Sequence, residues 1–330
     1  MGEDLDQLKS RIPLLDYLQR HNWAARSAGP SQEFVGLCPL HRESSPSFYV
    51  NAGRNLFYCH GCGHGGDLIR FVELFLKLPF RQSVAYLQRE LAAPASRLLE
   101  QAAAFYQLEL QRNPEGARYL QQRGLHHPAV IEELGIGYAP GGNLRRHLTA
   151  LGHSFESVLD LGLINHQGRD AFCRRVIFPC RQPGEVINLY GRSIGQAFPH
   201  RLLPRSKGGL VAWNSVRHCS SVILVEGLFD LAVLWQAGFR NTTCAIGTHL
   251  TLLQFNQLTE RPGRRVYIVF DQDDNQAGQR AAQQLRRRLA NAGVPAHVVQ
   301  LPAGHDPNSY FVTGATAPDF TGCLGQAQLS

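Results

Sequence analysis

The chain has no long hydrophobic run, because none of its apolar stretches approaches the roughly 18 residues of a membrane-spanning helix. Its first ten residues, Met1 to Ser10, are acidic and polar and differ from a secretory signal peptide. These two absences argue against a helical membrane protein and against export. We therefore expect a folded protein that stays in the cytoplasm.

Acidic residues are fewer than basic ones, 26 against 33, which gives a formal net charge of +7. This excess favours a polyanionic partner such as nucleic acid, although a basic protein without such a partner would have the same composition. The 330 residues, of which 44% are hydrophobic, suffice for two or three domains with separate cores.

Cysteine is unevenly distributed, with three of eight residues between positions 38 and 62. Cys38 and His41 are separated by two residues, as are Cys59 and Cys62, with seventeen residues between the pairs. In a chain without an export signal, this cluster indicates metal binding rather than disulfides. The spacing predicts a structural zinc site with three cysteines and one histidine. The alternative is a chance register of reduced cysteines and a surface histidine.

The residues around this cluster predict a small β-ribbon with helices. A helical period runs from Leu5 to Leu18, with a possible break at Pro13. Phe48–Val50 and Leu56–Tyr58 resemble the two strands of a hairpin, whose aromatic side chains can pack in a core or stack on bases. A helix is expected over Asp67–Leu78, and the sequence Ala-Ala-Pro-Ala-Ser at 92–96 predicts a linker.

The middle third of the chain is rich in arginine. Each of these side chains taken alone is expected to be a solvated charge, but together they predict a basic face. They are Arg145, Arg146, Arg174, Arg175, Arg192, Arg201, Arg205 and Lys207.

From Ser221 onward, apolar runs alternate with helical patterns. Strands are expected at Val222–Val225, Cys244–Ile246, Val266–Phe270 and His297–Leu301, with helices between them, including one over Ala277–Ala292. This alternation predicts an α/β fold with a parallel, doubly wound sheet.

Carboxylates follow the predicted strands. Glu226 follows the first strand, whereas Asp271 and Asp273 follow the strand that ends at Phe270. Asp230 and Asp306 lie beyond two strand ends. Because parallel strands end at one edge, where ligands bind in open α/β sheets, these groups predict a site for Mg²⁺ or Mn²⁺. A single carboxylate of this kind could equally cap a helix.

Taken together, these motifs resemble the bacterial DnaG-type primases over nearly the whole chain. The similarity includes the cysteine ribbon with its flanking segments, three motifs of the middle region and the two acidic motifs. The matching segments are Pro46–Phe48, Gly65–Asp67, Arg123–Leu125, Gly135–Pro140, Arg175–Pro179, Val225–Asp230 and Phe270–Asp273. The resemblance implies a zinc-ribbon domain at 1–93, the basic part of a polymerase core at 97–218 and a Toprim domain at 219–330.

The resemblance also implies an activity, which is Mg²⁺-dependent synthesis of short RNA primers from ribonucleoside triphosphates on single-stranded DNA. By this resemblance Cys38, His41, Cys59 and Cys62 bind zinc, and Glu226, Asp271 and Asp273 are catalytic. These three, with Asp230 and Asp306 nearby, hold Mg²⁺. The expected contacts to DNA and nucleotide phosphates are Arg145, Arg146, Arg175, Arg192, Arg201 and Lys207.

Three features depart from the family pattern. Asp306-Pro307-Asn308 replaces the usual Asp-Pro-Asp, so a second metal ion is expected to bind more weakly. Asp274–Gln276 lengthens the loop after the acidic motif. The chain ends at Ser330 without room for a helicase-binding domain, so we expect a short form that is recruited differently.

Two other functions remain open on the sequence alone. One is a non-catalytic accessory protein that binds single-stranded DNA, and the other is a Toprim-type nuclease. A topoisomerase would need a tyrosine nucleophile in a further large domain, for which the chain has no room.

Overall fold

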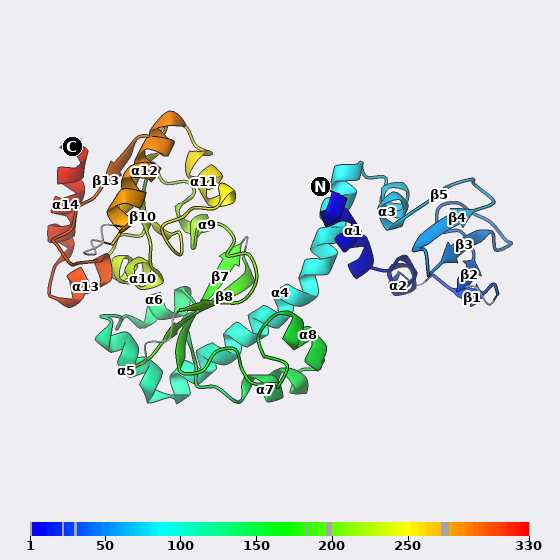
Figure 1. Ribbon diagram of the computed structural model, residues 1–330, viewed down its shortest axis with the longest axis horizontal. Coiled ribbons are helices and arrows are strands. Elements are labelled where there is room, and N and C mark those ends of the chain that lie inside the picture. Colours follow the sequence, from blue (N-terminus) through cyan, green and yellow to red (C-terminus); the bar gives the residue numbers. More distant parts are fainter. Residues whose placement is uncertain are drawn as a thin grey trace. The chain divides into compact units, whose positions relative to one another are not determined.

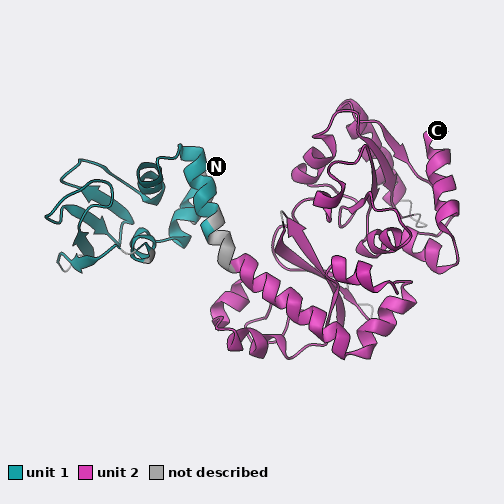
Figure 2. Ribbon diagram, turned by 180° about the vertical axis from the view of Figure 1, so that it is seen from behind, with its two compact units in different colours: residues 1–94 teal, residues 95–330 magenta. Residues whose placement is uncertain are grey.

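The computed structural model describes residues 2–21, 23–29, 32–182, 184–195, 200–271 and 277–329. The chain forms two compact units, Met1–Pro94 and Ala95–Ser330, drawn in teal and magenta in Figure 2. Among the described residues, no helix combines the length and hydropathy needed to cross a membrane.

Unit 1 is built around a five-stranded antiparallel sheet. The predicted hairpin forms its two strands β3 and β4, and the expected break at Pro13 separates helices α1 and α2. Asp67 accepts a hydrogen bond from the backbone N–H of Arg70 and so caps α3. The elements are α1 (Gly2–Arg11), α2 (Leu14–Arg20), β1 (Ala25–Ser27), β2 (Glu33–Gly36), β3 (Phe48–Asn51), β4 (Leu56–Cys59), β5 (Gly65–Gly66) and α3 (Leu68–Leu76).

Alternation along the hairpin separates its core face from its exposed face. Phe48 and Phe57 are buried and stack with ring centroids 5.1 Å apart, and Phe71 of α3 meets both rings edge-on. Tyr58, on the opposite face of β4, is 48% exposed. The sequence left two roles open for the aromatic residues of this ribbon, packing in a core and stacking on bases. Some of them lie in the core, whereas others lie on a surface that bases could reach.

The prediction of a linker at 92–96 is wrong, because these residues lie within helix α4 (Phe80–Arg112). Three of the five residues are alanine, the residue with the highest intrinsic helix propensity, and they favour a helix on both sides of the single proline. The division between the two units nevertheless falls at this point, between residues 94 and 95.

The first part of unit 2 contains an antiparallel sheet in the order β6-β7-β8-β9. Ile177 and Leu189 on one face pack with helices α4, α7 and α8, whereas Val176 and Phe178 belong to a core shared with the second sheet. The elements are α5 (Pro114–Gln122), α6 (Pro128–Glu133), β6 (Gly137–Ala139), α7 (Leu144–Ala150), α8 (Phe155–Asp160), β7 (Arg175–Gln182), β8 (Glu185–Ser193) and β9 (Arg201–Leu202).

The second part of unit 2 (Figure 1) confirms the predicted parallel α/β sheet. Its strand order is β11-β10-β12-β13. Three of its strands end earlier than the sequence suggested, at Cys244, at Val269 and at Val298. The elements are α9 (Trp213–Val216), β10 (Ser221–Val225), α10 (Leu228–Gln236), β11 (Thr242–Cys244), α11 (Leu252–Thr259), β12 (Arg265–Val269), α12 (Ala277–Asn291), β13 (Ala296–Val298), α13 (Pro307–Val312) and α14 (Ala317–Leu329).

Both faces of this parallel sheet are covered. Ile223 and Val225 pack in the core that contains α10 and α14, whereas Val222 and Leu224 pack in the core that contains α11 and α12. Burial on both faces explains the continuous apolar runs in the sequence. Polar groups are thus excluded from both faces, and the carboxyl edge of the sheet is the place where they can gather.

Candidate functional site

The four predicted zinc ligands lie together in unit 1. One ligand atom from each of Cys38, His41, Cys59 and Cys62 lies within 4.8 Å of all the others. Cys59 is the last residue of β4, and a side chain at Gly61 would come within 2.7 Å of the His41 ring. Glycine is therefore required where the second pair of ligands turns beneath the histidine.

Glu43 supports this cluster, although no sequence motif pointed to it. Its carboxylate accepts hydrogen bonds from the backbone N–H groups of Cys38, at 2.7 Å, and Ser47, at 3.1 Å. It also lies 3.2 Å from His41 Nε2, while His41 Nδ1 faces Cys59 Sγ at 3.9 Å. A carboxylate on the outer nitrogen is the usual way to orient a histidine ligand toward zinc.

The chemistry of these donors fits zinc. Burial raises the pKa of the Cys38 thiol to about 12, and the neighbouring Cys59 adds to this effect. Two buried sulfurs at close range favour a cation that replaces their protons, and a set of three cysteines and one histidine is typical of structural zinc sites.

A second cluster lies at the carboxyl edge of the parallel sheet. Carboxylate oxygens of Asp230, Asp271 and Asp306 all lie within 4.8 Å of one another. Asp230 lies in the first turn of α10, Asp271 follows β12 by two residues, and Asp306 precedes α13. A side chain at Gly278 would come within 2.5 Å of the Asp271 carbonyl, so the start of α12 packs directly against this edge.

Electrostatic repulsion in this cluster favours a cation. Burial, together with the nearby carboxylates of Asp306 and Asp271, raises the pKa of Asp230 well above its usual range. Asp230 is 4% exposed and accepts hydrogen bonds from the backbone N–H groups of Gly227, at 3.1 Å, and Asn308, at 2.9 Å. Three oxygen donors at this separation fit a hard divalent cation.

The other two predicted acids differ in placement. The β10–β12 ladder pairs Val225 with Val269, so Glu226 comes level with Phe270 and Asp271 lies one residue further along. Glu226 is half-buried beside Cys244, and it is not a member of the three-carboxylate cluster found among the described residues. Asp273 lies outside the described residues.

Three of the predicted arginines lie along adjacent strands of the antiparallel sheet. Arg175 begins β7, Arg192 lies near the end of β8, and Arg201 begins β9. Burial, followed by the charge of Arg201, lowers the pKa of Arg175. His200 stacks on Tyr190 at 5.5 Å, and burial with the charges of Arg192 and Arg175 lowers its pKa. Such a group of cations is suited to an anionic ligand.

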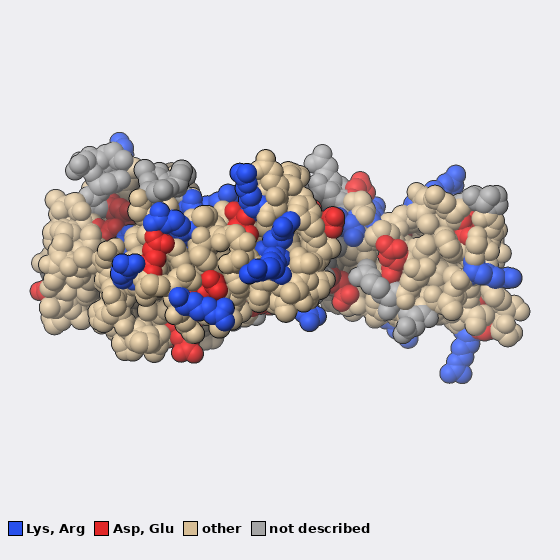
Figure 3. Space-filling view, turned by 90° about the horizontal axis from the view of Figure 1, so that it is seen from below, with Lys and Arg blue, Asp and Glu red and all other residues tan. Residues whose placement is uncertain are grey.

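Arg145 and Arg146 lie elsewhere. Both are on α7, which packs on the face of the β6–β9 sheet opposite to the one that meets α10. The structure does not bring them to the carboxylates. Basic side chains gather on the side of unit 2 seen in Figure 3, with acidic groups among them.

Lys207 has hydrogen-bond partners within the protein that a lysine bound to phosphate would not have. Its ammonium group donates hydrogen bonds to the backbone carbonyls of Ala245 at 3.0 Å, Ile246 at 3.1 Å and His249 at 2.9 Å. An ammonium group has three hydrogens to donate, and all three are used within the fold. We therefore leave Lys207 out of the set proposed to bind phosphate.

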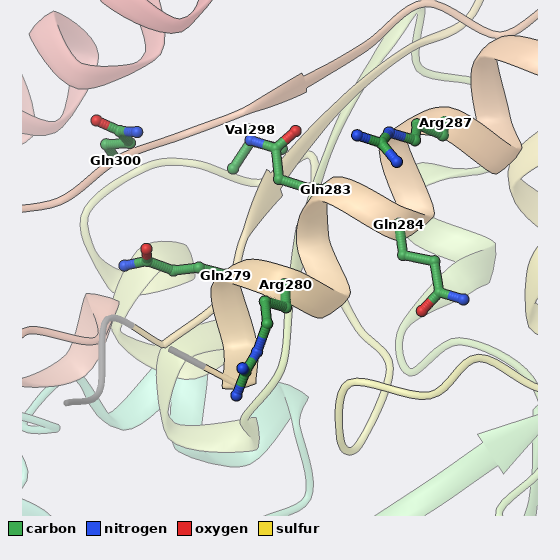
Figure 4. A pocket seen from close by; sticks show the side chains of 7 residues that line it. All are labelled: Gln279, Arg280, Gln283, Gln284, Arg287, Val298 and Gln300. Atoms are coloured by element: carbon green, nitrogen blue, oxygen red, sulfur yellow. The ribbon is translucent and has the colours of Figure 1, made fainter. Parts of the chain in front are cut away.

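A polar groove adjoins the start of α12 and has a volume of about 580 Å³. Figure 4 shows that most of its lining side chains project from α12, with Gln300 contributed by the segment after β13. Among the described residues that line it, none is acidic; they are Gln279, Arg280, Gln283, Gln284, Arg287, Val298 and Gln300. Amide and guanidinium groups of this kind suit phosphate or base ligands.

Comparisons with known proteins match all three parts of the chain. The family description "CHC2 zinc finger" matches residues 1–102, "DNA primase catalytic core, N-terminal domain" matches residues 105–203, and "Toprim domain" matches residues 221–317. The DNA primase of Aquifex aeolicus (strain VF5) is 30% identical over 94% of this chain. The chain matches the zinc-ribbon, core and Toprim domains of DnaG-type primases. It spans 66% of the length of that relative, which is less than two thirds.

Solved primase structures share the fold. The structure of the zinc-binding and RNA polymerase domains of the Aquifex aeolicus primase covers 98% of this chain, and the match spans 85% of that structure, with a TM-score of 0.63 and 29% identity. A DnaG primase catalytic domain bound to single-stranded DNA covers 70% of this chain, and the match spans 80% of that structure, with a TM-score of 0.60 and 28% identity. The zinc-ribbon family and the Toprim family support zinc in unit 1 and a divalent metal in unit 2.

Proposed function

We propose that this protein is a DNA primase, a DNA-directed RNA polymerase that makes short RNA primers on single-stranded DNA by nucleotidyl transfer. The observation that carries the proposal is the cluster of Asp230, Asp271 and Asp306 at the carboxyl edge of a Toprim-type sheet. We assign the catalytic role to this edge, with Glu226 and Asp273 as further metal-binding acids.

The metal proposed at this edge is Mg²⁺, with Mn²⁺ as a substitute. When bound, such an ion stabilises the charged oxygens of the attacking hydroxyl and the leaving group during phosphoryl transfer. The protein's part is to hold carboxylate oxygens in place and to bind triphosphate through cations. Arg175, Arg192 and Arg201 are the proposed phosphate contacts, and His200 joins them because it lies beside two of these arginines.

We propose that single-stranded template DNA binds to the exposed face of the zinc ribbon. Tyr49 and Tyr58 are directly opposite each other on β3 and β4, and the His60 ring meets them edge-on at 5.2 and 5.0 Å. Exposed aromatic rings on a small sheet form a stacking surface for bases, worth about 1–3 kcal/mol per base. The primase of known structure with bound single-stranded DNA supports a template of this kind.

The domain organisation is also part of the proposal. We divide the chain into a template-binding zinc ribbon at 1–93, the basic part of the core at 97–218 and a Toprim domain at 219–330. Its proposed location is the nucleoid within the cytoplasm, where single-stranded template and nucleotides are present. Ribonucleoside triphosphates are the proposed substrates.

Replacement of Asp271 by asparagine tests the proposal. Primer yield should fall about a hundredfold or more, because loss of even an outer partner of a metal ligand costs roughly 10- to 100-fold. Binding of single-stranded DNA should persist, since the ribbon and the arginines are unchanged. The measurement is incorporation of labelled ribonucleotide, alongside DNA binding by fluorescence anisotropy.

Asp160→Asn is the matched control. Asp160 is an exposed acid at the end of α8, so its replacement should change primer yield by no more than about twofold. An unchanged yield in Asp271→Asn would remove the carboxylate edge from the mechanism.

A further inference from the structure

We propose that Asn308 is a positioning residue that links Arg123 to Asp230 behind the carboxylate edge, and that this link sets the affinity of the edge for a divalent cation. The inference rests on the proposed metal-binding role of Asp230, Asp271 and Asp306. It assigns a role to two residues, Asn308 and Arg123, that lie 185 positions apart in the chain.

Asn308 uses every polar group of its side chain within the protein. Its Oδ1 accepts a hydrogen bond from Arg123 Nε at 2.5 Å, and its Nδ2 donates to the Arg123 backbone carbonyl at 2.7 Å. The residue is 1% exposed. An amide fits this position because it presents an acceptor to the guanidinium group and a donor to the carbonyl at the same time.

The backbone of the same residue supports the metal-binding acids. The Asn308 N–H donates to Asp230 Oδ1 at 2.9 Å, and Asp306 lies two residues earlier, where its carboxylate accepts a hydrogen bond from the backbone N–H of Ser309. The start of α13, with its N-cap Asp306, therefore carries one member of the cluster and holds a second. Whatever fixes this turn also fixes the separation between Asp230 and Asp306.

Arg123 is itself held in one orientation. Its guanidinium group stacks on the ring of Phe229, with 4.4 Å from Cζ to the ring centroid, and Nη1 approaches the hydroxyl of Tyr119 at 3.5 Å. Phe229 directly precedes Asp230 on α10. Arg123 thus contacts α10 through Phe229 and α13 through Asn308, and it ties together the two helices whose acids face each other.

The energetic reason for such a link is repulsion among the acids. Three carboxylates within 4.8 Å of one another would separate if their supports allowed it. A cation binds most tightly when the oxygens are already in place, and partners behind metal ligands typically contribute roughly 10- to 100-fold to metal affinity. We therefore expect Asn308 to act on metal affinity without being a ligand.

The test measures direct binding of Mn²⁺ to the full zinc-loaded chain without DNA or nucleotides. The concentration of free Mn²⁺ is read from its electron paramagnetic resonance signal. Asn308→Ala should weaken binding about tenfold, within the range for outer partners of metal ligands. Arg123→Lys, which keeps the charge but loses the paired geometry, should weaken it in the same direction.

Gln236→Ala is the matched control for the same contact region. The Gln236 side chain accepts from the backbone N–H groups of His126 and His127, at 3.0 and 2.9 Å, and donates to the Gly124 carbonyl at 2.8 Å. Gln236 therefore hydrogen-bonds the backbone of the segment next to Arg123 but not the carboxylates of Asp230, Asp271 or Asp306. Its Mn²⁺ affinity should stay within about twofold of the unmodified chain.

The results distinguish a role of Asn308 in metal affinity from a role in stabilising the fold alone. Unchanged Mn²⁺ affinity in folded Asn308→Ala overturns the proposal, as does an equal loss in Gln236→Ala, which would mean that the contact only stabilises the fold. If Asn308→Ala does not fold, Arg123→Lys decides by the same criterion. Unchanged Mn²⁺ binding in Asp271→Asn would instead contradict the metal site itself, and with it the proposed function.

Discussion

At the scale of single residues, Lys207 and Arg264 of unit 2 each donate hydrogen bonds to three backbone carbonyls. Lys207 donates to three carbonyls of the segment after β11, and Arg264 donates to the carbonyls of Gln257, Leu258 and Arg217. Arg264 is fully buried and lies 4.7 Å from the centroid of the Trp213 ring. Both residues fix loops by completing hydrogen bonds that helix and strand ends leave open.

Arg264→Met should therefore destabilise unit 2. The substitution keeps much of the side-chain volume but leaves three carbonyls without their donors, which we expect to cost roughly 2–4 kcal/mol. Arg265→Met, at the exposed neighbouring position, should stay within about 0.5 kcal/mol. Urea unfolding of both variants measures the difference, and equal stability of the two would refute the structural role of Arg264.

Residue roles could be predicted only where the signal is local in the sequence. The zinc ligands are such a case, because their two-residue gaps place the four side chains close together once the hairpin forms. Asn308 is the opposite case, since its partner Arg123 is remote in the chain. Glu43 and His200 were missed because neither a carboxylate near cysteines nor a lone histidine beside arginines has a distinctive spacing.

At the scale of elements, hydrophobic pattern predicted most strands and helices of the parallel sheet. Continuous apolar runs such as Val222–Val225 form strands covered on both faces, as expected. The pattern was misleading at residues 92–96, where alanine-rich sequence continues helix α4. It also could not show that Glu226 and Asp271 differ by one step in strand register, which separates Glu226 from the carboxylate cluster.

One prediction concerns strands β3 and β4 of the zinc ribbon and the turns that carry the zinc ligands. The purified chain should contain one zinc ion, and Cys62→Ser should lose it because three donors remain of a four-coordinate site. Amide hydrogen exchange in unit 1 should then rise, since structural zinc contributes about 10–16 kcal/mol of apparent binding energy to folding. Exchange in unit 2 should not change.

Cys173→Ser provides the control for this measurement. Cys173 is an exposed cysteine in unit 2, remote in sequence from the ribbon, and its replacement should leave the zinc content at one ion per chain. Zinc retained by Cys62→Ser, or lost from Cys173→Ser, would contradict the four-ligand site.

At the scale of the whole molecule, one compact unit contains both a carboxylate edge and a strip of arginines. Asp230, Asp271 and Asp306 come from the parallel sheet, whereas Arg175, Arg192 and Arg201 come from the antiparallel sheet, and the two sheets share a hydrophobic core. The net positive charge fits a polyanionic ligand. Composition could predict this partner class, but not which arginines the strands of the antiparallel sheet bring together.

The central claim is that this assembly polymerises ribonucleotides on a DNA template, and one assay tests it. The chain is incubated with single-stranded DNA, Mg²⁺ and labelled ribonucleoside triphosphates, and the products are separated by size. We predict short RNA products that require both the template and the metal. DNA binding without any product, or metal-dependent shortening of the DNA in the absence of nucleotides, would contradict the account.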